Sequence, residues 1–426
     1  MWHDGKWMTI ALAGLLMIAA TARAGDVPTA AEQRAEGSVR GPAQFTGARS
    51  VTGEIADDRA RRDGYLGLPE LHDALEPWYV WKGRVREETG LDFAFSYSAL
   101  YQRASHTGPG DERDAAGGVA RFLGTWTLVG RGTENTGAFV YRVEHRHTLG
   151  TDVPPTELGE SAGSGTPTAR TFSDFQWGAT IAYWKQRLFD GRVVVLAGRV
   201  DPTDYYDMYA LNSSQSHFLN QAFGSSPTLS APSFGFGAAA GVMVTEHLYA
   251  IGGLSDATGS ATRSRWSDLR DEKEFFTHAE FGWTPQQDRL ARDNIHLGFW
   301  NKERRSGADI PSDWGLTFSG STELANGLTP FLRAGYANGE TARQDRVVTA
   351  GIAVQHATDN LFGVGVSWGR PTDRDLDDQV TTELFYRIQL AENVHLTPDL
   401  QLVLDPSNDP GSSALWIAGL RLRISF

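Results

Sequence analysis

The 426-residue chain contains no cysteine, and after the amino terminus it has no long apolar run. The absence of cysteine excludes disulfides, a thiolate metal site and a cysteine nucleophile. No stretch reaches the ~18 consecutive apolar residues of a membrane-spanning helix. The net charge of −13 argues against a nucleic-acid partner, because phosphate binding needs an excess of Lys and Arg. A chain of this kind must gain its stability from a large core or a closed sheet.

The amino terminus has the three parts of a secretory signal peptide. Lys6 provides the positive charge, residues 9–20 form an apolar run, and Ala22-Arg23-Ala24 fits an A-x-A cleavage site. The run is too short to cross ~30 Å of hydrocarbon as a helix. We therefore expect residues 1–24 to be a signal peptide that is cleaved after Ala24, and the rest of the chain to be exported.

Two segments precede the first regular pattern. Residues 25–64 are polar, rich in Ala, Gly and Arg, and lack periodicity, which predicts a flexible amino-terminal extension. Residues 65–90 are expected to be partly helical, with short helices at 69–75 and 82–89. If the strands that follow close into a barrel, this segment is expected to lie at its periplasmic mouth and to plug it.

From residue 91 to residue 426 apolar and polar residues alternate, which is the period of a β-strand with one apolar face. In the last strand Trp416, Leu420 and Phe426 share one face, and Arg421 and Arg423 share the other. Strands of about ten residues joined by alternately short and long connections are typical of transmembrane barrels. The pattern predicts an all-β fold, a transmembrane antiparallel up-and-down β-barrel of about 16 strands over residues 91–426. The predicted strands are 91–103, 117–130, 136–148, 173–185, 192–200, 233–244, 247–256, 275–284, 293–302, 313–324, 328–338, 346–357, 360–369, 379–390, 393–404 and 415–426.

Several charged residues fall on the polar faces of these strands. A charged side chain on the lipid face costs ~2–4 kcal/mol at mid-membrane, so Arg421 and Arg423 are expected to face the lumen. Arg333, Glu383 and Arg387 are assigned to the lumen by the same alternation. Two interpretations remain open, a network of arginines paired with carboxylates or a constriction that contacts solutes. A lumen of about 16 strands is a water channel unless something plugs it, which predicts passive diffusion of small solutes.

Residues 198–232 interrupt the strand pattern with a segment that is too long and too aromatic for a plain surface connection. Carboxylates accept hydrogen bonds from sugar hydroxyls, and aromatic rings stack on the apolar faces of sugars. The composition fits equally a loop that folds into the lumen and contacts sugars and a surface loop held by its own aromatic residues. A short helix is expected at 216–223. The candidate residues are Asp201, Asp204, Tyr205 and Tyr206.

Other groups offer no clear chemistry. His145 and His147 share one face of a strand, but no third metal ligand is evident. The acidic residues at 375–378 lack the pattern of a calcium-binding loop, and no G-x-S-x-G nucleophile motif occurs. We therefore expect no catalytic residue, no metal and no cofactor. An outer-membrane hydrolase is the enzyme alternative.

Three segments resemble the carbohydrate-selective porins of the OprB type: GRVDPTDYYD at 198–207, HFLNQAF at 217–223 and FYRIQLAENVHLTPDLQLVLDPSNDP at 385–410. The resemblance covers roughly residues 80–426 and includes the terminal Phe426. It implies a sixteen-stranded outer-membrane barrel that passes monosaccharides and small polyols through a constriction of arginines and carboxylates. The positions that match these motifs are Arg199, Asp201, Asp204, Arg387 and Asp399.

The leading hypothesis is therefore a porin of a Gram-negative outer membrane for passive diffusion of small carbohydrates. One alternative is a general or organic-anion porin, favoured by the wall arginines. Another is a structural or adhesive barrel whose lumen is plugged by residues 25–89. The expected partners are small sugars in transit, outer-membrane lipid and lipopolysaccharide. A homotrimer is a further possibility, since trimers are common among large porins.

Overall fold

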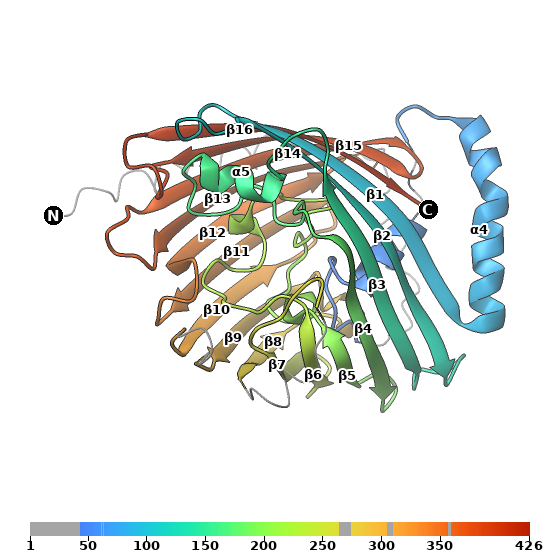
Figure 1. The fold of residues 1–426 in the computed structure, drawn as a ribbon. Helices are drawn as coiled ribbons and strands as arrows, with labels where there is room; N and C mark the ends of the chain where they lie inside the picture. Colours follow the sequence, from blue (N-terminus) through green and yellow to red (C-terminus); the bar gives the residue numbers. More distant parts are fainter. Residues whose placement is uncertain (1–42, 61, 63, 264–273, 305–309, 357–358) are drawn as a thin grey trace.

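The fold is a closed antiparallel barrel (Figure 1). The structure is a computed structural model that describes residues 43–60, 62, 64–263, 274–304, 310–356 and 359–426. Each strand among these residues pairs with its sequence neighbours, and β1 closes the barrel on β16. The strands are β1 (Leu91–Ala104), β2 (Asp114–Val129), β3 (Gly137–Thr148), β4 (Gln176–Leu188), β5 (Val193–Val200), β6 (Gly235–Met243), β7 (Leu248–Asp256), β8 (Phe275–Trp283), β9 (Asn294–Lys302), β10 (Asp313–Ser321), β11 (Leu328–Ala337), β12 (Gln344–Gln355), β13 (Leu361–Pro371), β14 (Gln379–Ala391), β15 (Val394–Leu404) and β16 (Ala414–Ser425).

The predicted strands match the observed ones one to one, and the fold class is confirmed. The bounds differ by a few residues at most; the strand predicted at 173–185, for example, is observed at Gln176–Leu188. The terminal residue completes the closure, because Phe426 and Phe95 exchange two backbone hydrogen bonds of 2.8 and 2.9 Å. The aromatic carboxy-terminus therefore belongs to the β1–β16 seam.

The two faces of the wall differ as the alternation predicts. In β16 Trp416 and Leu420 are 48% and 46% exposed on the outside, whereas Arg421 is fully buried inside the barrel. The same division recurs around the wall, where exposed Phe281 alternates with buried Glu280. Apolar side chains outside and charged side chains inside are the arrangement of a barrel with lipid around it and water within it.

The connections fall into two sets, one at each end of the barrel. The connections 189–192, 244–247, 356–360 and 392–393 are short, and they share one end with the start of β1 and the end of β16. We call it the short-turn end. The connections 149–175 and 201–234 belong to the opposite end, which we call the long-loop end. This alternation follows from the up-and-down topology.

Residues 43–60 and 62, called the segment 43–62 below, lie inside the barrel, which differs from the flexible extension expected at 25–64. Helix α3 (Val51–Arg59) packs against β1, β2 and β3, and the Ser50 side chain caps it by accepting a hydrogen bond from the Gly53 N–H. Val51 and Ile55 are buried in the same hydrophobic cluster as wall residues. The order comes from partners on the wall, so the segment's own composition does not reveal it. The predicted signal peptide 1–24 and residues 25–42 lie outside the described residues.

Helix α4 (Pro69–Thr89) is one continuous helix where two short ones were expected, and it lies outside the wall (Figure 1). At its start Tyr65 N–H bonds to the Gln389 carbonyl of β14 at 2.7 Å. At its end Trp126 of β2 donates to the Thr89 carbonyl, and Gly90 stops the helix with a φ of 77°. The helix therefore crosses the short-turn rim, and the segment that enters the lumen is 43–62 instead of 65–90. None of the helices in the described part of the chain is long and apolar enough to span a membrane.

The long loops also fold inward. The connection 149–175 carries helix α5 (Pro155–Ser161), and the connection 201–234 carries the short 3-10 helices η1 (Pro202–Asp204) and η2 (Gln221–Phe223). Another 3-10 turn, η3 (Gln287–Arg289), lies in a connection at the short-turn end. Phe218 and Phe223 of the second long loop pack on Phe331 and Phe385 of the wall. The helix expected at 216–223 is reduced to η2.

The reason for this reduction lies in the wall. Glu383 accepts hydrogen bonds from the backbone N–H groups of Leu219 and Asn220, at 2.5 and 2.8 Å. These N–H groups are therefore not free to bond to carbonyls four residues earlier, as a helix requires. The loop is held in an irregular conformation by a wall carboxylate.

Candidate functional site

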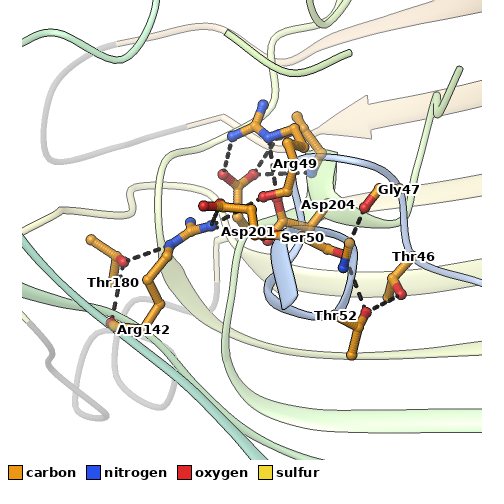
Figure 2. Close-up of polar contacts among 12 residues, drawn as sticks. Thr46, Gly47, Arg49, Ser50, Thr52, Arg142, Thr180, Asp201 and Asp204 are labelled. Carbon is orange, nitrogen blue, oxygen red and sulfur yellow. Dashed lines mark hydrogen bonds and ion pairs between the residues drawn. The ribbon is translucent and has the colours of Figure 1, made fainter. Parts of the chain in front are cut away.

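Arg49 joins the inward amino-terminal segment to the inward loop 201–234 (Figure 2). Its guanidinium lies 2.7 Å from the Asp201 carboxylate and 3.1 Å from that of Asp204. The wall takes part as well, because Arg142 of β3 donates to the Arg49 carbonyl at 3.2 Å and to Thr180 of β4 at 3.2 Å. Segment, loop and wall therefore meet at a single charged junction within the lumen.

The wall beside this junction carries alternating charges on β2 and β3. Glu144 lies between Arg121, at 2.7 Å, and Arg146, at 3.0 Å. Arg121 also pairs with Glu54 of α3 at 2.7 Å. Glu54, Arg121, Arg142 and Glu144 are almost completely buried, and a buried charge is stable only when it is paired. The ion pairs thus fix α3 against the wall.

Burial raises the pKa of Asp204 to about 7, although Arg142 and Arg49 oppose this shift. The balance is different for Asp57 of α3. Burial alone would raise the pKa of Asp57, but Arg62 and Arg423 hold it well below its usual range. The junction therefore holds one carboxylate that titrates near neutral pH, whereas α3 holds one that stays ionised.

Two cavities lie on either side of the junction. The first, of about 260 Å³, is on the long-loop side, and Asp201, Ser213 and Gln215 contribute to its lining. The second, of about 280 Å³, is on the short-turn side, and Ser213 lines it too. Ser213 therefore borders both cavities, and Arg49 lines the first of them. The arginines of the first cavity are Arg49, Arg121, Arg142, Arg146 and Arg170.

The predicted site residues fall into separate places. Asp201 and Asp204 lie at the junction with Arg49. Arg387 and Arg423 line the short-turn cavity, and Arg423 pairs with Asp57 of α3 at 2.9 Å. The first pair therefore lies where the inward amino-terminal segment meets the inward loop, and the second pair lies deeper toward the short-turn end.

Four other predicted residues hold the inward loop to the wall. Arg333 pairs with Asp207, and its guanidinium lies 4.6 Å from the centre of the Tyr209 ring. Arg421 donates to the Ser214 and His217 carbonyls at 2.6 and 3.0 Å. Two neighbouring carboxylates also anchor the loop. One accepts hydrogen bonds from loop N–H groups directly, and the other is linked to the loop residue Asn220 through Gln401. These carboxylates are Glu383 and Asp399.

The remaining predicted residues lie apart from the junction. Tyr205 and Tyr206 are buried in the hydrophobic cluster, with ring centres 5.4 and 4.9 Å from that of His278, and neither lines a cavity described above. The sugar-stacking role expected of them is therefore not supported by their position. Arg199 donates to the carbonyls of Ala261 and Arg263 and lines a separate cavity of about 330 Å³.

Sequence reasoning missed the charges that converge from β2, β3 and the segment 43–62. A signal was present in β3, where Arg142, Glu144 and Arg146 alternate with Tyr141, Val143 and His145 and so share the inward face. No comparable signal marks Arg49, because its partners lie far away in the sequence. Among the described residues no group of three or more His, Cys, Asp or Glu side chains could hold a metal ion.

Comparison with known proteins identifies the family. The family model for "Carbohydrate-selective porin, OprB family" matches residues 154–322 and 312–426, which is more than half of the chain. The chain belongs to the OprB family of carbohydrate-selective porins. It is therefore a passive sugar porin, a channel rather than an enzyme, and family membership implies an outer-membrane location. None of the curated proteins matches the chain.

Solved structures support the fold of this OprB-family chain. A structure of Pseudomonas putida OprB at high pH superposes with a TM-score of 0.65 and 15% sequence identity, over 82% of this chain and 97% of that one. An engineered mutant of Rh. blastica porin superposes with a TM-score of 0.52 and 12% identity, over 79% of this chain and 100% of that one. At these sequence identities the similarity shows that the barrel fold is shared.

Proposed function

We propose that the junction at Arg49 and Asp201, together with Ser213, is the selective narrow part of this sugar channel. The supporting observation is that Ser213 borders both cavities, and that Arg49 and Asp201, which pair with each other, line the first cavity with it. A solute that passes must exchange hydrogen bonds with water for hydrogen bonds with these groups. Sugar hydroxyls can both donate hydrogen bonds to the carboxylate and accept them from the guanidinium. The hydrogen bonds that a sugar gives up with water on entering are therefore replaced, and the free-energy cost of entry is small.

The inward segments set the bore in this proposal. Residues 43–62 and the loop 201–234 fill space that about sixteen strands would otherwise leave to water. The loop is anchored by Arg333, Glu383 and Arg421, so its shape is fixed before a solute arrives. A rigid bore with fixed polar groups selects by size and hydrogen bonding, without a source of energy.

The setting of the channel completes the proposal. Short turns face the periplasm in outer-membrane barrels, so the short-turn end, with α4 at its rim, is assigned to the periplasmic side. Residues 1–24 are proposed to be removed after Ala24 on export. Outer-membrane lipid and lipopolysaccharide are the proposed surroundings of the outer face, and a homotrimer stays a prediction.

Liposome swelling tests the function and the narrow part together. Purified protein should let glucose and xylose enter faster than they enter empty liposomes. The Ser213→Trp variant should slow both sugars, because its ring would occupy the passage between the cavities. Entry at the rate of empty liposomes would contradict the function, and unchanged entry through Ser213→Trp would contradict the assignment of the narrow part.

The position of α3 favours a second candidate, a structural barrel whose lumen is closed by residues 43–62. In that case the intact protein would conduct no ions and pass no sugar, and conductance would appear only after the segment is removed. A single-channel recording of the intact protein separates the two functions, because the sugar channel must conduct without any deletion.

A further inference from the structure

Arg170 stands out among the arginines of the long-loop cavity, because its partners are neutral. Its guanidinium donates to the Asn212 side-chain oxygen at 2.8 Å and to the Phe218 carbonyl at 3.2 Å. Within the described residues no carboxylate lies within ion-pair distance of it, and its buried Nε has no hydrogen-bond partner. Burial lowers the pKa of Arg170 to about 10, so the side chain stays charged at neutral pH. The cavity wall thus carries one cation that forms no ion pair with the described residues.

Arg146 provides a second site of incomplete pairing in the same lining. One of its terminal nitrogens pairs with Glu144 at 3.0 Å and the other donates to Ser173 at 3.2 Å, which leaves its buried Nε without a partner. The guanidinium lies 4.7 Å from the centre of the Phe175 ring. This stacked position restrains the guanidinium and keeps it at the cavity surface.

Gln215 is an independent sign that this cavity binds a polar ligand. This residue is only 2% exposed and lines the cavity, yet neither its side-chain oxygen nor its nitrogen has a hydrogen-bond partner within the structure described. A buried amide without partners is costly, so a site of this kind is normally completed by water or a ligand. One donor and one acceptor on the same side chain suit a ligand with hydroxyl groups.

The charge balance of the cavity is positive. Five arginines line it, and the carboxylates that pair with them are Glu54, Glu144, Asp201 and Asp204. Of these four carboxylates, only Asp201 is part of the lining. Five cations against four anions leave one net positive charge. The lining itself is more positive still, because the other three carboxylates do not line this cavity.

We propose, building on the sugar channel proposed above, that the long-loop cavity binds monosaccharides that carry a carboxylate, such as hexuronates, in preference to neutral sugars. The carboxylate of the solute would accept hydrogen bonds from Arg170 and Arg146. The hydroxyl groups would complete the pairing of Gln215. The neutral polar residues of the lining, which include Thr171, Gln221 and Ser225, offer further partners to the ring hydroxyls.

Block of the single-channel current measures this preference. Glucuronate and glucose are added in turn to the purified full-length protein at constant ionic strength, with acetate as a carboxylate that has no sugar ring. We expect glucuronate to reach half-block at a concentration about tenfold lower than glucose, as one added charge-assisted hydrogen bond implies, and acetate to be as weak as glucose or weaker. Equal half-blocking concentrations for glucuronate and glucose would overturn the proposal. A half-blocking concentration of acetate as low as that of glucuronate would overturn it too, because the sugar ring would then contribute nothing.

Variants locate the effect. Arg170→Gln should bring the half-blocking ratio of glucuronate to glucose close to one, and Arg170→Lys, which keeps the charge, should retain much of the preference. Arg374→Gln removes the same charge from a side chain that is 59% exposed and does not line the cavity, so it should leave the ratio unchanged. A preference that survives Arg170→Gln overturns the assignment to this cavity. If neither sugar blocks the current or enters liposomes, the sugar channel itself fails; if glucose enters and glucuronate has no advantage, only the preference fails.

Discussion

Arg49 and Asp201 form an ion pair of 2.7 Å between two segments that are 152 residues apart. Neither residue belongs to a wall strand, yet both line the long-loop cavity within the lumen. Two inserted segments therefore hold each other within the lumen, at the place proposed as its narrow part. The wall fixes their position, since Arg142 reaches both the Arg49 carbonyl and the Asp204 carboxylate.

Weakening the hold on α3 should widen the channel. Glu54→Gln combined with Asp57→Asn removes the ion pairs from α3 to Arg121 and Arg423. We expect a larger single-channel conductance and a weaker discrimination between xylose and larger sugars, because α3 then leaves the lumen for part of the time. Glu87→Gln with Glu88→Gln removes two carboxylates from the exposed end of α4 and is the matched control. A conductance that is unchanged relative to this control would show that α3 does not limit the bore.

Loss of Glu144 should destabilise the barrel. This carboxylate is completely buried between Arg121 and Arg146, with Arg142 beside it, and the Glu144→Gln substitution leaves three buried arginines with less counter-charge. Removing one partner of a buried ion pair costs roughly 3–5 kcal/mol. We expect unfolding of the purified barrel at a clearly lower urea concentration.

An exposed ion pair gives the comparison for this result. Asp114 pairs with Arg103 at 2.8 Å with both side chains partly exposed, and such pairs contribute about 0–1 kcal/mol. Asp114→Asn should therefore change the urea midpoint little. Similar shifts in the Glu144 and Asp114 variants would contradict the view that the buried network stabilises the wall.

The wall was predictable from the sequence because a barrel wall repeats one local rule. Each strand alternates a lipid face and a lumen face, so the positions of Arg421 and Arg423 follow from Trp416 and Leu420 alone. The unusual character of residues 198–232 was also predictable from their length and aromatic content, although a surface loop fitted these features equally well. These features depend on neighbours in the sequence.

The contents of the lumen were not predictable in this way. The segment 43–62 is polar and aperiodic by itself, and its order depends on Arg121, Arg142 and Arg423, which lie far along the chain. The directions in which the loop side chains point were not predictable for the same reason. Carboxylate and tyrosine are adjacent in the sequence at 204–206, but Asp204 faces the junction and the two rings face the hydrophobic cluster.

This orientation changes the result expected for Tyr205 and Tyr206. Replacement of both by Ala removes two rings that pack on His278, and deletion of a buried aromatic ring costs roughly 3–5 kcal/mol. The loop should loosen, so ion conductance and sugar preference should change together. Replacement of both by Phe, which keeps the rings, should leave both properties close to those of the unmodified protein. A change in sugar preference alone would favour direct contact between these rings and the sugar.

Asp204 should make the channel sensitive to pH. Burial raises its pKa to about 7, above the ordinary value of an aspartate, so the folded protein binds this proton more tightly than the unfolded chain does. The contribution of Asp204 to the free energy of unfolding is therefore fully present below the ordinary pKa of an aspartate. It is lost as pH rises through the folded-state pKa of about 7. Protonation also removes one negative charge beside Arg49 and Arg142, so anion selectivity should increase as pH falls from 8 to 6.

The zero-current potential in a salt gradient measures this selectivity at pH 6 and at pH 8. Asp204→Asn should show the selectivity of the protonated channel at both values, because its side chain is neutral throughout. Asp111→Asn, in an exposed connection at the long-loop end, should keep the pH dependence of the unmodified protein. The same pH dependence in the Asp204→Asn channel would assign the titration to another group. Its loss in that variant alone would identify Asp204 as the carboxylate through which pH acts on the narrow part of the lumen.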